Sequence, residues 1–352
     1  MKKFIEIDNR KIGKNYPPFI IAEISGNHDG SFSRAIKLID IAVEAGADAV
    51  KFQTFKPESL TFNTNDKRFA IMSGSWKGKK LFDVYEQAMT PWEWFYDLFA
   101  YSKKRGITAF SSPFDHKAVE FLESLNCPAY KIASNELNDF YLIDRVIETN
   151  KPIIFSTGVA SKEDINSLKH HLSKKNFDKY ILLHCVSEYP ASHRNSNLKT
   201  MQEISENNSL ITGFSDHTLG ITSSLAAVAI GASVIEKHIT ISHDDGAIDS
   251  HFSLEPEELN TLCSESKKIW ESIGKVKYGK DTDLWEKGIF TRQFWSNKLI
   301  RKNEIITKEN ISSVRAPSNE EGICPSKYEE LFGRQAKRDI DAHSPIIWDD
   351  IV

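Results

Sequence analysis

The sequence predicts a (β/α)8 TIM barrel that is preceded by a β-hairpin and followed by a small second domain. Eight short apolar runs alternate with helical stretches over residues 19–273, and this alternation is typical of a parallel sheet covered by helices. Polar or ionisable residues follow each run, as they do where a barrel carries its active site. A separate set of apolar runs begins near residue 291 and predicts the second domain.

Composition and charge exclude several classes of protein. The chain has 352 residues, of which 40% are hydrophobic and 27% charged, as in ordinary globular proteins. A net charge of −4 provides no basic surface for nucleic acid. No apolar run approaches the roughly 20 residues of a membrane span, and the first residues lack a signal-peptide core. The four scattered cysteines lack CxxC spacing. We therefore expect reduced thiols and a cytoplasmic protein without nucleic-acid or membrane partners.

The predicted hairpin comes first in the chain. Residues 3–16 contain apolar residues on both sides of Asp8-Asn9-Arg10, and Asp and Asn favour tight turns. Beyond Pro17-Pro18 the pattern changes to alternating strands and helices.

Eight apolar runs are the predicted barrel strands. A doubly wound open sheet is the alternative, but that fold usually has a GxGxxG turn after its first strand, and this chain has none. The barrel is therefore favoured. The runs are Phe19–Ile24, Ala49–Phe52, Ile107–Phe110, Ala129–Ala133, Pro152–Phe155, Tyr180–Leu183, Leu210–Phe214 and Ser233–Ile235.

The predicted helices lie between and after these runs. The first is apolar at helical spacing and is followed by Gly46, which is a common C-cap residue. The helices are Ser33–Ala45, Pro91–Arg105, Lys117–Leu125, Phe140–Thr149, Lys162–Lys174, Leu198–Glu206, Thr222–Ala229 and Pro256–Ile273.

Two segments fall outside this repeat. Residues 55–90 form a long excursion with few helical signals, which we interpret as a partly ordered rim above the barrel mouth. Residues 274–290 are polar and charged, which predicts a linker. The expected organisation is therefore a barrel over residues 1–273 and a second domain over residues 291–352. A domain of about 60 residues is marginally stable alone and would gain from docking on a barrel.

The candidate site residues lie at the ends of the predicted strands, where barrel active sites are built. Helix capping explains Ser, Asp and Asn there, but it does not explain lysines, several carboxylates and three histidines. In chain order these residues are Glu23; Lys51 and Gln53; Ser112; Lys131, Ser134 and Glu136; Ser156; His184, Cys185, Glu188 and Tyr189; Ser215, Asp216 and His217; and Glu236, Lys237 and His238.

Two lysines with hydroxyl groups suggest an anion site. A single lysine at a strand end is usually a surface residue, but Lys51 and Lys131 occupy equivalent positions on two strands. Ammonium and hydroxyl donors bind phosphate and carboxylate oxygens. The hydroxyls come from Ser112, Ser134, Ser156 and Ser215.

Two histidines at neighbouring strand ends suggest a metal site. A single histidine is more often a core residue, but adjacent parallel strands lie about 4.8 Å apart, so His217 and His238 could share one ion. Two imidazoles with oxygen ligands favour Mn²⁺ or Mg²⁺ over structural zinc. Glu23 and Glu136 are either ion-pair partners of the lysines or groups that transfer protons and bind hydroxyls.

These motifs together resemble the sialic acid synthase family, whose members make nonulosonic acids. The end of the chain, with Phe332-Gly333-Arg334 and Arg338-Asp339-Ile340, is similar to the family's antifreeze-like (SAF) domain. The barrel motifs that carry the resemblance are Ile21-Ala22-Glu23, Asn27-His28, the run from Ala45 to Gln53, Lys131-Ile132-Ala133-Ser134, Ser156-Thr157-Gly158, Ser215-Asp216-His217-Thr218, the run from Gly231 to His238, and Ser253-Leu254-Glu255-Pro256.

Within the family, the stretches at 76–87, 90–94, 111–115 and 249–254 are most similar to the branch that makes pseudaminic acid. Asn135 departs from the usual pattern, and His184 and Glu188 are nearer to the N-acetylneuraminate and legionaminate branches. Those two products remain alternatives, and a non-catalytic sugar-binding protein is the alternative of another class.

The resemblance implies a condensation of phosphoenolpyruvate with an open-chain N-acetylated amino sugar, for cell-surface glycans such as those on flagellin. It implies that His217 and His238 hold a divalent ion and that Glu136 transfers a proton. Arg315 would reach the barrel of a partner subunit in a domain-swapped homodimer. The phosphoenolpyruvate-binding residues would be Lys51, Gln53, Ser112, Lys131, Ser134, Ser156 and Ser215, and the sugar-binding residues Glu23, Tyr189, Asp249 and Arg315.

Overall fold

The computed structural model describes residues 4–72, 77–206, 210–278, 291–315 and 320–352. They belong to two compact units, Met1–Gly274 and Lys275–Val352. Most of the predicted linker, at 279–290, lies outside the described residues.

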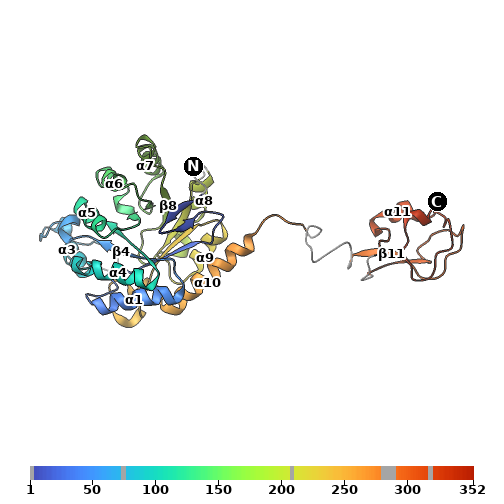
Figure 1. Ribbon diagram of the computed structural model, residues 1–352, viewed down its shortest axis with the longest axis horizontal. Coiled ribbons are helices and arrows are strands. Elements are labelled where there is room, and N and C mark those ends of the chain that lie inside the picture. Colours follow the sequence, from blue (N-terminus) through green and yellow to red (C-terminus); the bar gives the residue numbers. More distant parts are fainter. Residues whose placement is uncertain (1–3, 73–76, 207–209, 279–290, 316–319) are drawn as a thin grey trace. The chain divides into compact units, whose positions relative to one another are not determined.

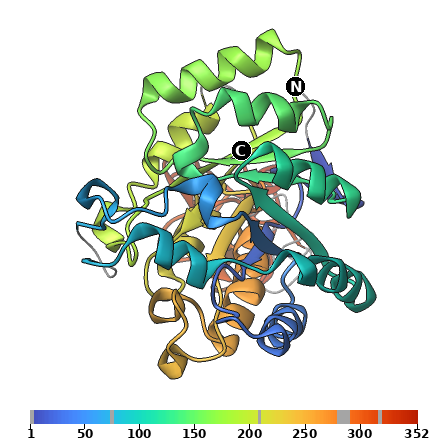
Figure 2. The same cartoon turned by 90° about the vertical axis from the view of Figure 1, so that its left-hand side faces the viewer.

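The first unit is a closed barrel of eight parallel strands, which confirms the predicted fold class. The strands are paired in the order β10-β3-β4-β5-β6-β7-β8-β9, and helices surround them (Figures 1 and 2). Their apolar residues form one continuous core. The strands are β3 Phe19–Glu23, β4 Ala49–Thr54, β5 Thr108–Pro113, β6 Tyr130–Ile132, β7 Ile153–Ser156, β8 Tyr180–Cys185, β9 Thr212–Asp216 and β10 Val234–His238.

The barrel helices pack their apolar faces on the strands. Gly46 ends α1 in the left-handed conformation, with a φ of 83° that favours glycine. The predicted helix at 91–105 is a 3-10 turn, Trp92–Trp94, followed by α4. The helices are α1 Phe32–Ala45, α4 Phe95–Arg105, α5 His116–Ser124, α6 Phe140–Ile147, α7 Lys162–Lys174, α8 Lys199–Glu206, α9 Thr222–Ala229 and α10 Pro256–Ile273.

The predicted hairpin consists of β1 Ile5–Ile7 and β2 Arg10–Ile12. Its turn is Asp8-Asn9, since Arg10 already pairs with Ile7, and both turn residues have positive φ, as in the two-residue turns that suit hairpins. Arg10 pairs with Asp48, just before β4, at 3.0 Å. The hairpin therefore lies at the amino-terminal end of the barrel, opposite the strand ends that carry the polar groups.

Six barrel strands, β4, β5, β7, β8, β9 and β10, continue further than their apolar runs predicted. β9 extends to Asp216, and β10 includes Glu236, Lys237 and His238. The polar residues continue the parallel ladder because their side chains alternate between two buried environments, the barrel interior and the layer beneath the helices. Glu236 and His238 therefore share one face of β10, and Lys237 lies on the other.

The excursion at 55–90 is more helical than its sequence indicated. It contains α2 Pro57–Leu60, a 3-10 turn at Lys67–Phe69 and α3 Leu81–Ala88. Phe82 and Val84 of α3 are buried, so packing stabilises a short helix that has weak sequence signals.

The second unit has its own core, to which ten of its described residues contribute buried side chains. Its described residues contain an antiparallel ribbon, β11 Arg292–Ser296 and β12 Ile311–Arg315, the short helix α11 Tyr328–Leu331, and 3-10 turns at Pro325–Lys327 and Trp348–Asp350. In neither unit is any described helix long and apolar enough to cross a bilayer.

Candidate active site

A polar cavity of about 60 Å³ lies at the carboxyl ends of the barrel strands. It includes every residue assigned above to catalysis, metal, phosphoenolpyruvate or sugar except Glu136, Asp249 and Arg315, and it is also lined by Phe114, Ala133, Cys185 and Glu236. The predicted residues that line it are Glu23, Lys51, Gln53, Ser112, Lys131, Ser134, Ser156, Tyr189, Ser215, His217 and His238.

Four charged side chains form a buried chain of alternating sign across this cavity. Lys51 lies 2.7 Å from Glu23 and 3.7 Å from Glu236, and Lys131 lies 3.9 Å from the same oxygen of Glu236. Burial lowers the pKa of Lys131. Burial also opposes ionisation of Glu236, but Lys131 and Lys51 hold its pKa below the usual range. The carboxylates of Glu23 and Glu236 therefore hold the two lysine side chains in place before any ligand binds.

Glu236 is a residue that sequence reasoning placed at a strand end but to which it gave no binding or catalytic role. Its Oε1 accepts a hydrogen bond from Ser215 at 3.1 Å, and its Oε2 is buried without a hydrogen-bond partner. The signal was available in the spacing, because Glu236 and His238 are two apart on a strand and must share a face.

The serine hydroxyls differ in how they are already bonded. The Ser112 hydroxyl accepts a hydrogen bond from Lys51 at 3.5 Å, and the Ser134 hydroxyl accepts one from the backbone amide of Gly158 at 3.0 Å. Ser156 has a buried hydroxyl with no partner. A buried unpaired hydroxyl is costly, so Ser156 is suited to donate to an anionic oxygen of a ligand.

Glu136 lies beside the cavity in a 3-10 turn, Ser134–Glu136, that follows β6. Its Oε2 is buried without a hydrogen-bond partner. Burial raises its pKa to about 7, although Lys131 acts in the opposite direction. A carboxyl group that changes its protonation state near neutral pH is suited to proton transfer.

The two predicted metal ligands are neighbours, with ring centroids 5.3 Å apart. His217 Nδ1 lies 2.9 Å from the carbonyl oxygen of Val186. Because a carbonyl only accepts, Nδ1 carries the proton and the neutral ring leaves Nε2 free for a ligand. Burial lowers the pKa of His217, but Cys185, whose thiol lies 3.9 Å away, raises it on balance.

His238 is kept neutral by its surroundings. Burial and then the positive charges around it hold its pKa well below the usual range. Among the residues that the structure describes, no three His, Cys, Asp or Glu side chains form a metal cluster. In their neutral forms the two imidazoles would nonetheless fit an ion whose other ligands are oxygens of water or substrate, as Mn²⁺ and Mg²⁺ prefer.

The residues predicted to bind sugar are brought together only in part. Tyr189 covers His217 at a ring distance of 4.3 Å, and Glu23 accepts from Gln53 at 2.8 Å. Asp249 lies behind His238, with a carboxylate oxygen 3.8 Å from Nδ1. Arg315 belongs to the second unit and ends β12.

A second buried ion pair lies on the other face of the same two strands. Lys237 and Asp216 are paired across β10 and β9, at 3.1 Å, with no exposed side-chain surface. Asp216 also accepts from Ser224 of α9 at 2.6 Å, and Lys237 donates to the carbonyl of Thr218. This pair ties together the strand ends that carry His217 and His238.

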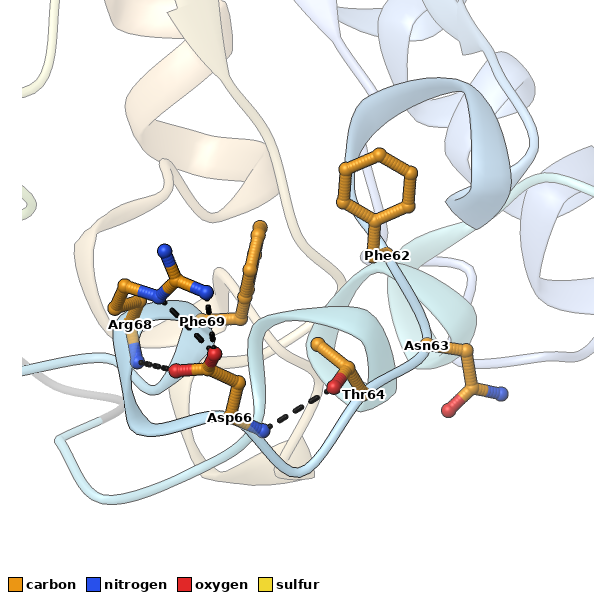
Figure 3. A pocket seen from close by; sticks show the side chains of 6 residues that line it. All are labelled: Phe62, Asn63, Thr64, Asp66, Arg68 and Phe69. Atoms are coloured by element: carbon orange, nitrogen blue, oxygen red, sulfur yellow. Dashed lines mark hydrogen bonds and ion pairs between the residues drawn. The ribbon is translucent and has the colours of Figure 1, made fainter.

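A larger hollow of about 630 Å³ lies in the excursion after β4. Figure 3 shows that its polar contacts include an ion pair between Asp66 and Arg68, beside Phe62 and Phe69. Arg68 is 82% exposed, and none of the described residues that line this hollow is a buried charged group. A catalytic site needs buried polar or charged side chains that converge on one point. The smaller cavity at the barrel mouth has them, so it is the candidate active site.

Comparisons with known proteins identify the family of this chain. The family model described as the NeuB family matches residues 38–278, and that described as the SAF domain matches residues 295–352. Pseudaminic acid synthase of Campylobacter jejuni subsp. jejuni serotype O:23/36 (strain 81-176) is 39% identical, over 92% of this chain and 93% of that protein. N,N'-diacetyllegionaminic acid synthase of C. jejuni subsp. jejuni serotype O:2 is 35% identical, over 91% and 96%.

A solved structure supports the same conclusion. The N-acetylneuraminic acid synthetase of Leptospira borgpetersenii serovar Hardjo-bovis, in complex with citrate, is similar with a TM-score of 0.71 and 34% identity, over 79% of this chain and 92% of that chain. These relatives are enzymes, so the non-catalytic alternative is not supported, and the predicted family and SAF domain are confirmed. The chain belongs to the NeuB family of sialic and nonulosonic acid synthases, and it is a transferase that forms a carbon–carbon bond.

Proposed function

We propose that this enzyme condenses phosphoenolpyruvate with 2,4-diacetamido-2,4,6-trideoxy-L-altrose to give pseudaminic acid and phosphate, with the help of a divalent metal ion. The observation that supports it most is the convergence of two buried lysines, two neighbouring histidines and a proton-transfer carboxyl at one barrel mouth.

Lys131 and Ser156 are best placed to receive the anionic groups of phosphoenolpyruvate. Lys51 is engaged by Glu23 at 2.7 Å, whereas Lys131 has its acidic neighbour Glu236 at 3.9 Å. Ser156 offers its unpaired hydroxyl beside them. Gln53, Ser112, Ser134 and Ser215 complete the lining.

In the reaction, C3 of phosphoenolpyruvate forms a bond to the aldehyde carbon of the sugar. The aldehyde oxygen takes up a proton and becomes a hydroxyl group. Water adds to C2, and phosphate leaves as the bond between C2 and the bridging phosphate oxygen breaks, which gives a ketone at C2. Glu136, with a pKa near 7, accepts the proton of that water. A divalent ion on His217 and His238 would supply Lewis-acid polarisation of the aldehyde oxygen. Glu23, Tyr189 and Asp249 would bind and orient the sugar.

The choice of sugar is supported by the stretches similar to the pseudaminate branch and by the C. jejuni pseudaminic acid synthase at 39% identity. Phosphate release by the purified enzyme, with Mn²⁺, phosphoenolpyruvate and each sugar in turn, tests it. We expect turnover with the altrose derivative. Turnover only with N-acetylmannosamine would contradict the proposal and indicate an N-acetylneuraminate synthase. Turnover only with its diacetamido-trideoxy analogue would indicate a legionaminate synthase instead. The Glu136→Gln enzyme is the matched control.

We also propose a domain-swapped homodimer in which Arg315 reaches the partner's barrel. Exposed apolar side chains follow the carboxyl ends of several strands, including Val159 at 57% and Leu219 at 53%. The second unit exposes Phe332 and Trp348. Apolar surface on both parts favours an interface.

Subunit mixing tests this arrangement. Glu136→Gln and Arg315→Ala subunits, unfolded and refolded together in equal amounts, should recover about a quarter of full activity. Half of all dimers formed are then heterodimers, and each heterodimer has one intact site of its two. If each subunit completes its own site, mixing will recover nothing.

We propose a cytoplasmic enzyme whose product serves cell-surface glycans such as those on flagellin. None of its four cysteines, all of which the structure describes, is in a disulfide, which fits a reducing compartment.

A further inference from the structure

Ser25 has a backbone conformation that a serine rarely adopts. It follows β3 by two residues, is 1% exposed and has a φ of 46°, in the left-handed region. Strained residues of this kind persist where the surrounding structure holds them, and they concentrate at functional sites. Ser25 was absent from the residues predicted from the sequence.

The hydroxyl of Ser25 bridges two side chains of the site. Oγ donates to Asp249 Oδ2 at 2.7 Å, and it lies 3.2 Å from Nδ1 of His238. The direct distance between His238 Nδ1 and Asp249 is 3.8 Å, which is too long for a hydrogen bond. Ser25 is therefore the link between the two.

The direction of this link determines the tautomer of His238. A hydroxyl has one proton, and Ser25 gives it to the carboxylate of Asp249. Nδ1 of His238 must then donate its own proton to Oγ, and Nε2 keeps the lone pair. His217 is held in the same tautomer by a backbone carbonyl, so both rings present Nε2 as the free nitrogen.

The residues after Ser25 hold the same two partners in place. Gly26 allows the loop that carries Asp249 to approach, since a Cβ there would lie 2.5 Å from Ile248. Asn27 accepts from the amide of Asp249 at 3.0 Å and donates to the carbonyl of Ile239 at 2.8 Å. The strained turn at residues 25–27 thus joins the loop of Asp249 to the end of β10.

We propose that Ser25 is a positioning residue that fixes His238 with its proton on Nδ1 and couples this ring to the carboxylate of Asp249. This arrangement would leave Nε2 of His238 available as a metal ligand. It would also link the His238 ring to Asp249, the residue assigned to sugar binding. The metal role in this inference rests on the proposed function, whereas the tautomer of His238 does not.

Two substitutions separate the hydroxyl from the backbone strain. Ser25→Ala removes Oγ alone, and Ser25→Gly removes Oγ together with the penalty of a positive φ, so the glycine variant should fold at least as well as the wild type. Ser102→Ala is the matched control, because Ser102 is a buried serine of α4 whose hydroxyl donates to the carbonyl of Leu98 at 2.8 Å.

The first measurement is the ¹⁵N chemical shift of the His238 ring in the metal-free protein, assigned with a His238→Gln sample. We expect the Nδ1–H tautomer in the wild type and in Ser102→Ala, and a mixture of tautomers in both Ser25 variants. The second is calorimetric titration with Mn²⁺, in which we expect binding roughly 10- to 100-fold weaker in both Ser25 variants.

An unchanged ring tautomer in Ser25→Ala and Ser25→Gly would overturn the proposal, as would unchanged Mn²⁺ affinity in both variants of an enzyme that binds Mn²⁺ through His238. If the wild type binds no Mn²⁺, or if His238→Ala binds it equally well, the proposed metal role fails instead. The ring tautomer then still decides what Ser25 does.

Discussion

Replacing Glu136 by glutamine should change both activity and the pH dependence of stability, because the same burial causes both. Burial raises the pKa of this carboxyl from its usual 4.5 to about 7. Between these two values the folded protein binds a proton that the unfolded chain has released. The contribution of Glu136 to stability is therefore largest below pH 4.5 and falls as the pH rises to about 7.

The size of this effect follows from the raised pKa. One pKa unit corresponds to about 1.4 kcal/mol, so a rise from 4.5 to about 7 corresponds to at most about 3 kcal/mol of stability lost across this range. Glutamine has no charge to desolvate. The stability of Glu136→Gln relative to the wild type should therefore increase by up to about 3 kcal/mol between pH 4.5 and pH 7.5.

Urea unfolding followed by tryptophan fluorescence, at several pH values, measures this difference, and other titrating groups cancel between the two proteins. In the same variant kcat/KM should fall roughly 10²- to 10⁴-fold, and the wild-type kcat/KM should decline below about pH 7 as Glu136 becomes protonated. Parallel stability curves for the two proteins, or full activity in the variant, would refute the assignment.

Three further substitutions test other parts of the site. His238→Ala should weaken Mn²⁺ binding and activity while circular dichroism stays unchanged; full activity in the chelated variant would contradict the metal role. Arg315→Ala should raise the KM for the sugar but not for phosphoenolpyruvate, and an unchanged KM for the sugar would exclude its contact. Lys237→Met should lower the unfolding free energy by about 3–5 kcal/mol, because Asp216 is left buried and unpaired. Adding Asp216→Leu should recover part of that loss, and no recovery would indicate a packing role instead.

Sequence reasoning identified the fold and most of the residues at the barrel mouth, because both follow from simple periodicities. Buried parallel strands are short apolar runs, and their carboxyl ends meet at one face, so Lys51, Lys131, His217 and His238 could be placed together without coordinates. It placed the ends of β9 and β10 too early, because polar side chains that are buried by pairing, such as Asp216 and Lys237, have the composition of a loop.

The excursion after β4 was misread for a related reason. Propensity and pattern gave few helical signals there, and α3 forms because Phe82 and Val84 are buried by tertiary contacts. Its open hollow also shows that the volume of a cavity alone does not identify an active site.

By itself the sequence determined the barrel, the family motifs and the types of side chain at the mouth, since these depend on spacing along the chain. Only the tertiary structure decided which of these groups touch. Glu236 became the anion between two lysines, burial brought the pKa of Glu136 to about 7, and a turn at Ser25 was found to join His238 to Asp249. The contacts of Ser25 join residues more than 200 positions apart. The electrostatics of all these groups depend on burial, which no local pattern records.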